Sequence, residues 1–120
     1  TLSYVAHSVT LGREVTLVGC SMVSGSAVVR DGAWLGPNAS INQHLVVGEH
    51  CYIGTGSVVT RNLPPHALAY GSPAKVRGWV CSCHAKLEFS AGAAVCERCQ
   101  IGYTLEGELV TRTPGMERGS

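Results

Sequence analysis

Hydrophobic side chains recur every six residues from Val5 to Leu63, without an insertion or a gap. The first position of each unit is aliphatic, and most of these residues are β-branched, which favours extended backbone. They are Val5, Leu11, Leu17, Val23, Val29, Leu35, Ile41, Val47, Ile53 and Val59. The fifth position is small or apolar: Val9, Val15, Ser21, Ala27, Ala33, Ala39, Leu45, Cys51, Ser57 and Leu63.

This period predicts a β-solenoid. An ordinary half-buried strand repeats every two residues and an amphipathic helix every 3.6, whereas six residues form one short face and one turn. Three faces close a triangular coil, and neighbouring coils stack at the strand spacing of about 4.8 Å. Residues 5–63 therefore predict a little over three coils, with glycine suiting tight corners at Gly12, Gly36, Gly48 and Gly54. The alternative is a β-sandwich with irregular turns, against which the unbroken register argues.

Composition narrows the range of functions. A chain of 120 residues with a net charge of +1 accommodates one domain and a small appendage. It has no run of Lys or Arg, so nothing points to a nucleic-acid surface or an anionic membrane. We find no apolar stretch long enough to span a membrane and no signal peptide before the repeats. Because the chain begins at Thr1, one residue short of a strand, we expect upstream coils or an upstream domain.

The segment from Ala6 to Thr60 begins AHSVTLGREV and continues through the repeats. It resembles the acylglucosamine N-acyltransferases of lipid A synthesis and the sugar acetyltransferases of sialic-acid and bacillosamine pathways. This resemblance implies an all-β, left-handed parallel β-helix that assembles as a homotrimer, with His7 as the catalytic general base. A single His suits the chemistry, because its ordinary pKa near 6.5 lets it take a proton from an attacking amine or hydroxyl. Without that context, an exposed His is a solvated polar residue.

The resemblance also implies a substrate-binding role for His44 and Asn42, which lie in an Asn-Gln-His segment. His44 follows His7 by two coils and one residue, which places it about 10 Å further along the axis, so we expect no contact between them. A zinc site like that of the γ-carbonic anhydrases is disfavoured, because His44 and His50 lie six apart on different faces. We interpret His50 as a surface residue.

Residues 54–76 read GTGSVVTRNLPPHALAYGSPAKV and resemble the terminal segment of acetyl-CoA-dependent members of the same class, with Ser72 in place of the usual Asn. We expect Pro64 and Pro65 to end the repeat (1–63), since proline removes an N–H and restricts φ. Residues 64–79 would then leave the β-helix and cover a groove between subunits. The resemblance implies that five residues contact acetyl-CoA: Thr55, Thr60, Arg61, Lys75 and Arg77.

A different pattern begins at Trp79, where a Cys-x-Cys pair is followed by a Cys-x-x-Cys pair. The four thiols are Cys81, Cys83, Cys96 and Cys99. Two pairs of thiolates suit tetrahedral zinc, and residues 80–110 resemble a zinc ribbon with a structural metal. His84 and Gln100 stand where ribbon knuckles usually have Gly, and His84 is an alternative ligand. Disulfides or free thiols are the other interpretation, and residues 111–120 predict a disordered tail.

Together these features favour a cytoplasmic acyltransferase that moves acetyl from acetyl-CoA to an amine or hydroxyl of a nucleotide-linked sugar. Two alternatives stay open. One is N-acyl transfer from acyl carrier protein, as in the lipid A enzymes. The other is a non-catalytic solenoid scaffold, which would have no reason to combine His7 with a Gly-Ser-Pro-Ala-Lys ending.

Overall fold

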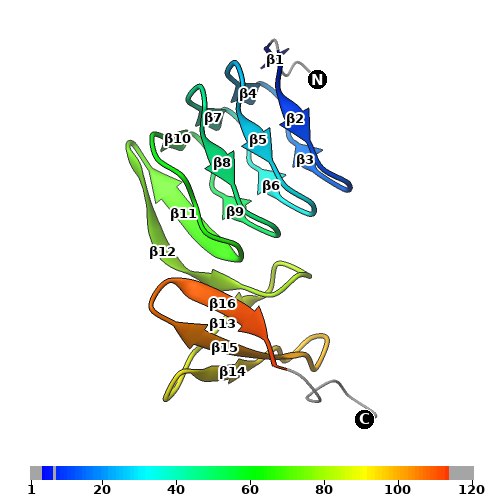
Figure 1. The fold of residues 1–120 in the computed structure, drawn as a ribbon, viewed down its shortest axis with the longest axis vertical. Helices are drawn as coiled ribbons and strands as arrows, with labels where there is room; N and C mark the ends of the chain where they lie inside the picture. Colours follow the sequence, from blue (N-terminus) through cyan, green and yellow to red (C-terminus); the bar gives the residue numbers. More distant parts are fainter. Residues whose placement is uncertain (1–3, 7, 114–120) are drawn as a thin grey trace.

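The computed structural model describes residues 4–6 and 8–113, and these contain strands and turns but no helix, so none that could span a membrane (Figure 1). Ten two-residue strands begin at every sixth residue, which confirms the period seen in the sequence. They are β1 (Tyr4–Val5), β2 (Thr10–Leu11), β3 (Thr16–Leu17), β4 (Met22–Val23), β5 (Val28–Val29), β6 (Trp34–Leu35), β7 (Ser40–Ile41), β8 (Val46–Val47), β9 (Tyr52–Ile53) and β10 (Val58–Val59).

The strands pair in parallel and form the three faces of a β-solenoid. The first face contains β1, β4, β7 and β10, the second contains β2, β5 and β8, and the third contains β3, β6 and β9. Each residue pairs with the residue one coil of 18 later, as Tyr4 does with Met22 and Thr16 with Trp34. The predicted β-helix is therefore confirmed, and equivalent residues of successive coils lie above one another.

The interior is filled by the aliphatic and small positions of the repeat. Leu35, Ile41 and Ile53 are fully buried, and the small residues between them, such as Ala33 and Ala39, are buried with them. Removing such apolar area from water is the main favourable contribution to folding.

Cys51 occupies one of the small interior positions. Its thiol donates a hydrogen bond to the carbonyl oxygen of Pro64 at 3.1 Å. Burial raises the pKa of this thiol to about 12, and the side chain packs as a small apolar residue of the core.

The structure gives the second-position glycines a different role from the tight corners that we expected. A residue with positive φ recurs at the corners, and most of these residues are not glycine, for example Ser26, Asn38 and His44. The second-position glycines instead allow the next coil to approach. A Cβ on Gly48 would lie 2.5 Å from the backbone nitrogen of Pro65, and one on Gly36 would lie 3.0 Å from the carbonyl oxygen of Ile53.

A fourth coil extends past the two prolines, which we had expected to end the repeat. Leu63 bridges to Val47 in parallel, and β11 (Ala67–Gly71) pairs in parallel with β9 on the third face. Both pairings join residues 16 apart, so this coil is two residues shorter than the others. The shortening falls between Val59 and Leu63, where the regular two-residue turn is missing.

The chain then turns back and builds a small second unit. β12 (Ala74–Val80) runs antiparallel to β11, and β13 (Lys86–Leu87) pairs with the end of β12. A separate antiparallel sheet follows: β14 (Ala93–Val95), β15 (Gly102–Glu106) and β16 (Leu109–Arg112). Figure 1 shows this unit at the end of the β-helix opposite β1. β16 ends inside the expected tail, and residues 114–120 lie outside the described residues.

We expect Gly48→Ala to lower the free energy of unfolding by about 3 kcal/mol, because the added methyl group would meet the backbone of the next coil. The matched control is Gly56→Ala. Its Cβ would meet no atom within 4 Å, and it should cost only the strain of a positive φ, about 1 kcal/mol. Urea unfolding measures both, and equal losses would contradict the close-approach explanation.

Candidate functional site

The first corner, between the first and second faces, carries the residues expected to bind substrate. It includes residues 25–26, 43–44 and 60–62 in successive coils, and the backbone N–H of His44 donates to the carbonyl oxygen of Gly25 at 3.0 Å. The backbone N–H of Asn42 donates to the carbonyl oxygen of Val59 at 3.0 Å. Both side chains are exposed. His7, the expected base, lies outside the described residues.

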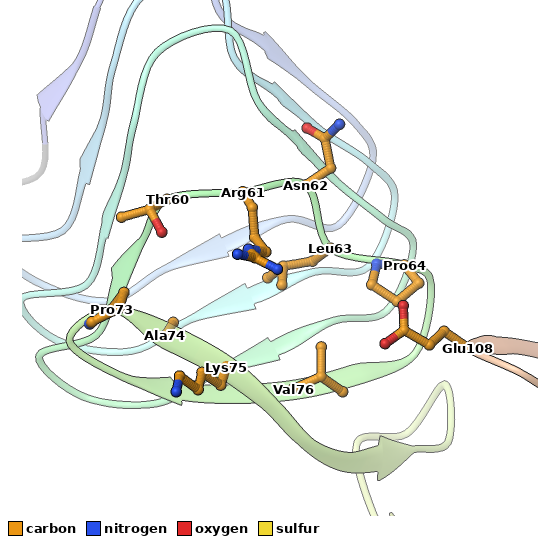
Figure 2. Close-up of a pocket in the computed structure, with 10 residues that line it drawn as sticks. All are labelled: Thr60, Arg61, Asn62, Leu63, Pro64, Pro73, Ala74, Lys75, Val76 and Glu108. Atoms are coloured by element: carbon orange, nitrogen blue, oxygen red, sulfur yellow. The ribbon is translucent and has the colours of Figure 1, made fainter.

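A cavity of about 430 Å³ opens at the end of the β-helix, where the last coil is shortened (Figure 2). Three segments line it: the shortened corner and its continuation, the start of β12, and the turn between β15 and β16. The lining residues are Thr60, Arg61, Asn62, Leu63, Pro64, Pro73, Ala74, Lys75, Val76 and Glu108.

The cavity combines an apolar floor with charged groups at its edge. Leu63 and Ala74 are buried and belong to the core of the β-helix, whereas Arg61, Lys75 and Glu108 are exposed. Figure 2 shows Arg61 and Lys75 on separate segments of the lining, with Glu108 entering from the other unit. Two cations beside an apolar surface suit a ligand that has both phosphate groups and an apolar portion.

The structure brings together three of the five residues expected to bind the cofactor. Thr60, Arg61 and Lys75 line the cavity, and Thr55 and Arg77 do not. The Arg77 guanidinium lies 5.1 Å above the Tyr70 ring, and its Nε–H donates to the Tyr70 carbonyl oxygen at 3.3 Å. Asn62, Val76 and Glu108 are lining residues that the sequence did not single out.

The four late cysteines form one cluster, with all their sulfur atoms within 4.8 Å of one another. Individual separations are 3.1 Å for Cys81 and Cys99, 3.6 Å for Cys83 and Cys96, and 3.9 Å for Cys83 and Cys99. A tetrahedral metal with Zn–S bonds of about 2.3 Å would set these separations near 3.8 Å. The geometry therefore fits a four-thiolate metal site.

The environment of the cluster favours at least one thiolate. Burial acts against it at Cys81, but the backbone of Cys83 and the hydroxyl of Tyr103 hydrogen-bond to the sulfur, and the pKa of Cys81 falls to about 6. The Tyr103 hydroxyl lies 3.2 Å from this sulfur. Burial and the neighbouring thiols raise the pKa of Cys99 to about 12. A cation among the sulfurs would favour their thiolate form.

His84 is not part of this cluster. Its Nε2–H donates to the carbonyl oxygen of Gly32 on the β-helix at 2.9 Å, and its ring stands edge-on to Tyr52 with centroids 5.8 Å apart. His84 and Gln100 both have positive φ, 69° and 65°. They therefore adopt the left-handed backbone that glycine usually supplies at ribbon knuckles.

A group of rings joins the two units, and it includes His50, which we had interpreted as a surface residue. The His50 ring lies 5.2 Å from that of His66, which lies 5.1 Å from that of Tyr103. The Nδ1–H of His66 donates to the carbonyl oxygen of Val80 at 2.8 Å. His50 is half-buried, and its ring packs against His66 of the next coil.

Comparison with known proteins agrees with this architecture. Residues 26–61 match the family Bacterial transferase hexapeptide (six repeats). A solved structure titled Serine Acetyltransferase- Complex with Cysteine shares the fold, with a TM-score of 0.52 over 62% of this chain and 41% of that one, at 22% identity. Within the repeat region the chain therefore matches the hexapeptide-repeat family, and it shares the solenoid fold of that solved structure.

Two relatives bear names of acyl-transferring enzymes. A dTDP-3-amino-3,6-dideoxy-alpha-D-galactopyranose 3-N-acetyltransferase from Aneurinibacillus thermoaerophilus is 47% identical over 88 residues, which are 73% of this chain and 45% of the relative. A UDP-3-O-acylglucosamine N-acyltransferase from Caulobacter sp. (strain K31) is 35% identical over 80 residues, which are 66% of this chain and 24% of the relative. The chain spans less than half the length of either relative.

We expect the partial burial of His66 to make stability depend on pH. Burial lowers the pKa of His66 from its ordinary value of 6.5, the carbonyl of Val80 opposes this, and His50 adds to the lowering. The unfolded chain then binds this proton more readily than the folded chain. The free energy of unfolding therefore falls as the pH drops below 6.5, by at most about 1.4 kcal/mol per pH unit for one proton.

His66→Asn tests this dependence, because Asn keeps an N–H donor and tolerates the positive φ of 66°. We expect thermal denaturation between about pH 7.5 and pH 5.5 to show a shallower loss of stability in the variant. His50, His84 and Glu49 also act on this ring and remain in both proteins, so identical slopes would show that His66 is not responsible.

Proposed function

We propose that this protein is an acyltransferase that moves acetyl from acetyl-CoA to an amine or hydroxyl of a nucleotide-linked sugar. The observation that carries the proposal is the end cavity, which places Arg61 and Lys75 beside an apolar floor. The relative named as a dTDP-amino-sugar N-acetyltransferase supports the reaction and the acceptor class. An amine acceptor is favoured over a hydroxyl because this relative and the N-acyltransferase both bear names of amine acylation.

Within this proposal, the cofactor's phosphates bind Arg61 and Lys75, and Thr60 supplies a hydroxyl beside them. Charge-assisted hydrogen bonds between these cations and phosphate are among the stronger polar contacts. Thr55 and Arg77 contact a different part of the same molecule. Both lie near Tyr70, since Arg77 stacks on its ring and Gly54, next to Thr55, approaches its Cβ.

The proposed reaction is a direct transfer with His7 as general base. The acceptor nitrogen or oxygen attacks the thioester carbonyl, its proton passes to the imidazole of His7, and the thiolate of CoA leaves with the electron pair of the C–S bond. His7 and His44 are 37 residues apart in the sequence, two coils and one residue, and we propose that they act on the same substrate. We propose that His44 and Asn42 orient the sugar.

We further propose that the protein works as a cytoplasmic homotrimer and that the cysteine cluster holds structural zinc. The sulfur separations and the second-unit core around them support the metal. Four protein ligands would fill a tetrahedral site and leave no position for a substrate, so the zinc would be structural. Zinc would draw the two knuckles together and neutralise thiolates that the chain alone does not stabilise. A reducing cytoplasm keeps such thiols available for the metal.

A second candidate is N-acyl transfer from acyl carrier protein, which the UDP-3-O-acylglucosamine N-acyltransferase relative supports. A carrier protein would present the same phosphopantetheine chemistry without the adenosine part of CoA. A non-catalytic scaffold is the third alternative, and binding without turnover would favour it.

The test of acetyl transfer is the release of CoA thiol from acetyl-CoA with a panel of UDP- and dTDP-amino sugars. We expect release that depends on the acceptor, and we expect His7→Ala to slow it by about 10²-fold to 10⁴-fold, the usual contribution of a general base. The matched control is Ser8→Asn, which keeps the positive φ of 62° at the neighbouring corner residue and should retain activity. Full activity in His7→Ala would exclude this base.

Zinc binding has a separate test in Tyr103→Phe. The variant keeps the ring against His66 but removes the hydroxyl 3.2 Å from the Cys81 sulfur, so we expect zinc affinity to fall by about 10-fold to 100-fold. Competition with a chromophoric chelator measures the affinity, with Tyr52→Phe on the β-helix as control. A wild-type protein that purifies with far less than one zinc per chain would contradict the metal assignment.

A further inference from the structure

The cavity at the end of the β-helix is not built by the β-helix alone. Nine of its lining residues belong to the segment from Thr60 to Val76, and the tenth, Glu108, belongs to the turn between β15 and β16. Figure 2 shows the Glu108 side chain reaching the cavity beside Pro64 from a separate ribbon segment. The appended unit therefore forms one wall of the proposed cofactor site.

This wall is held in place by specific contacts between the two units. The backbone N–H of Val80 donates to the carbonyl oxygen of His66 at 2.8 Å, and the Nδ1–H of His66 donates back to that of Val80. His84 donates to Gly32 at 2.9 Å. Trp79 packs against both hydrophobic cores. The β15–β16 turn is thus carried on a unit that is docked at several points.

A carboxylate in this wall restricts what the cavity can accept. A ligand that binds Arg61 and Lys75 is anionic, and an unpaired carboxylate facing an anion is unfavourable. Glu108 is exposed, and no ion pair to it is found among residues 4–6 and 8–113. The arrangement is favourable only when the ligand presents an N–H or O–H donor at the Glu108 side and phosphate at the cationic side.

We propose that Glu108 is a specificity-determining residue that accepts a hydrogen bond from the adenosine part of CoA, through the ribose hydroxyl or the adenine amino group. The inference rests on the proposed function, because it assumes that CoA occupies this cavity. It adds that the appended unit selects the nucleotide-bearing donor. Phosphopantetheine on a carrier protein has no adenosine and would gain nothing from Glu108.

Calorimetric titration with CoA and with 4′-phosphopantetheine tests this assignment on the purified, zinc-loaded protein. We expect Glu108→Ala to weaken CoA binding about 10-fold, as loss of a hydrogen bond to a charged group does. Phosphopantetheine binding should stay unchanged or become tighter, because this anion gains no hydrogen bond from the carboxylate. The matched control is Glu106→Ala, an exposed carboxylate of the same hairpin that does not line the cavity. Arg61→Ala reports whether the cavity is the CoA site at all.

The outcomes separate the two proposals. If CoA binds and Arg61→Ala weakens it, but Glu108→Ala matches Glu106→Ala or binds CoA more tightly, the role of Glu108 is wrong and the proposed function stands. If CoA does not bind the wild-type protein, or Arg61→Ala has no effect, the cofactor site itself is wrong. A further arm uses CoA analogues that lack the 2′-hydroxyl or carry oxygen for the 6-amino group. With one of these analogues, wild type and Glu108→Ala should have the same affinity. If wild type binds both analogues more tightly than Glu108→Ala does, the assigned hydrogen bond is wrong.

Discussion

The rest of this molecule depends on backbone hydrogen bonding between successive coils, in which each residue pairs with the residue 18 positions later. The N–H of Thr16 donates to the carbonyl of Ala33, and the N–H of Trp34 donates to that of Cys51, so each face is a parallel ladder. Equivalent positions are therefore forced above one another. Aliphatic residues must stack on aliphatic residues, and corner residues on corner residues, or the whole register would shift.

The same constraint explains why the candidate cofactor site lies at one end of the solenoid. A regular coil leaves no cavity, because the next coil covers it at strand spacing. The last coil is two residues shorter at the first corner, and no further coil follows it among the described residues. β12 crosses this end only in part, with Ala74 reaching the core, and the remaining opening is the cavity with its cationic edge.

The appended unit has a weaker core of its own and depends on two other kinds of contact. Its buried cluster is small and includes two of the cysteines, Cys81 and Cys96, so a metal among the sulfurs would contribute much of its stability. His66, His84 and Trp79 contribute contacts between this unit and the β-helix. This docking places the unit beside the cavity, and Glu108 of the unit lines it.

The fold could be predicted from the sequence because the same six-residue pattern occurs ten times with an unchanged period. The cysteine cluster was readable for a related reason, since ligand spacing within each knuckle is local. Thr60, Arg61 and Lys75 were found through their resemblance to a family, and they meet in the cavity. His7, the expected base, lies outside the described residues.

Tertiary structure alone decided the contacts between segments that are distant in the chain. Glu108 is 47 residues from Arg61, and no local pattern connects the hairpin turn to the shortened corner. We interpreted His50 as a surface residue and His84 as an alternative ligand. In the structure the His50 ring packs against His66 of the next coil, and His84 donates to Gly32 of the β-helix. The sequence also did not predict that the solenoid continues past Pro64 and Pro65. Proline has no N–H to donate, and the fourth coil pairs through Leu63 and β11 instead. Periodicity records which face a residue occupies, whereas only the folded chain determines what packs against that face.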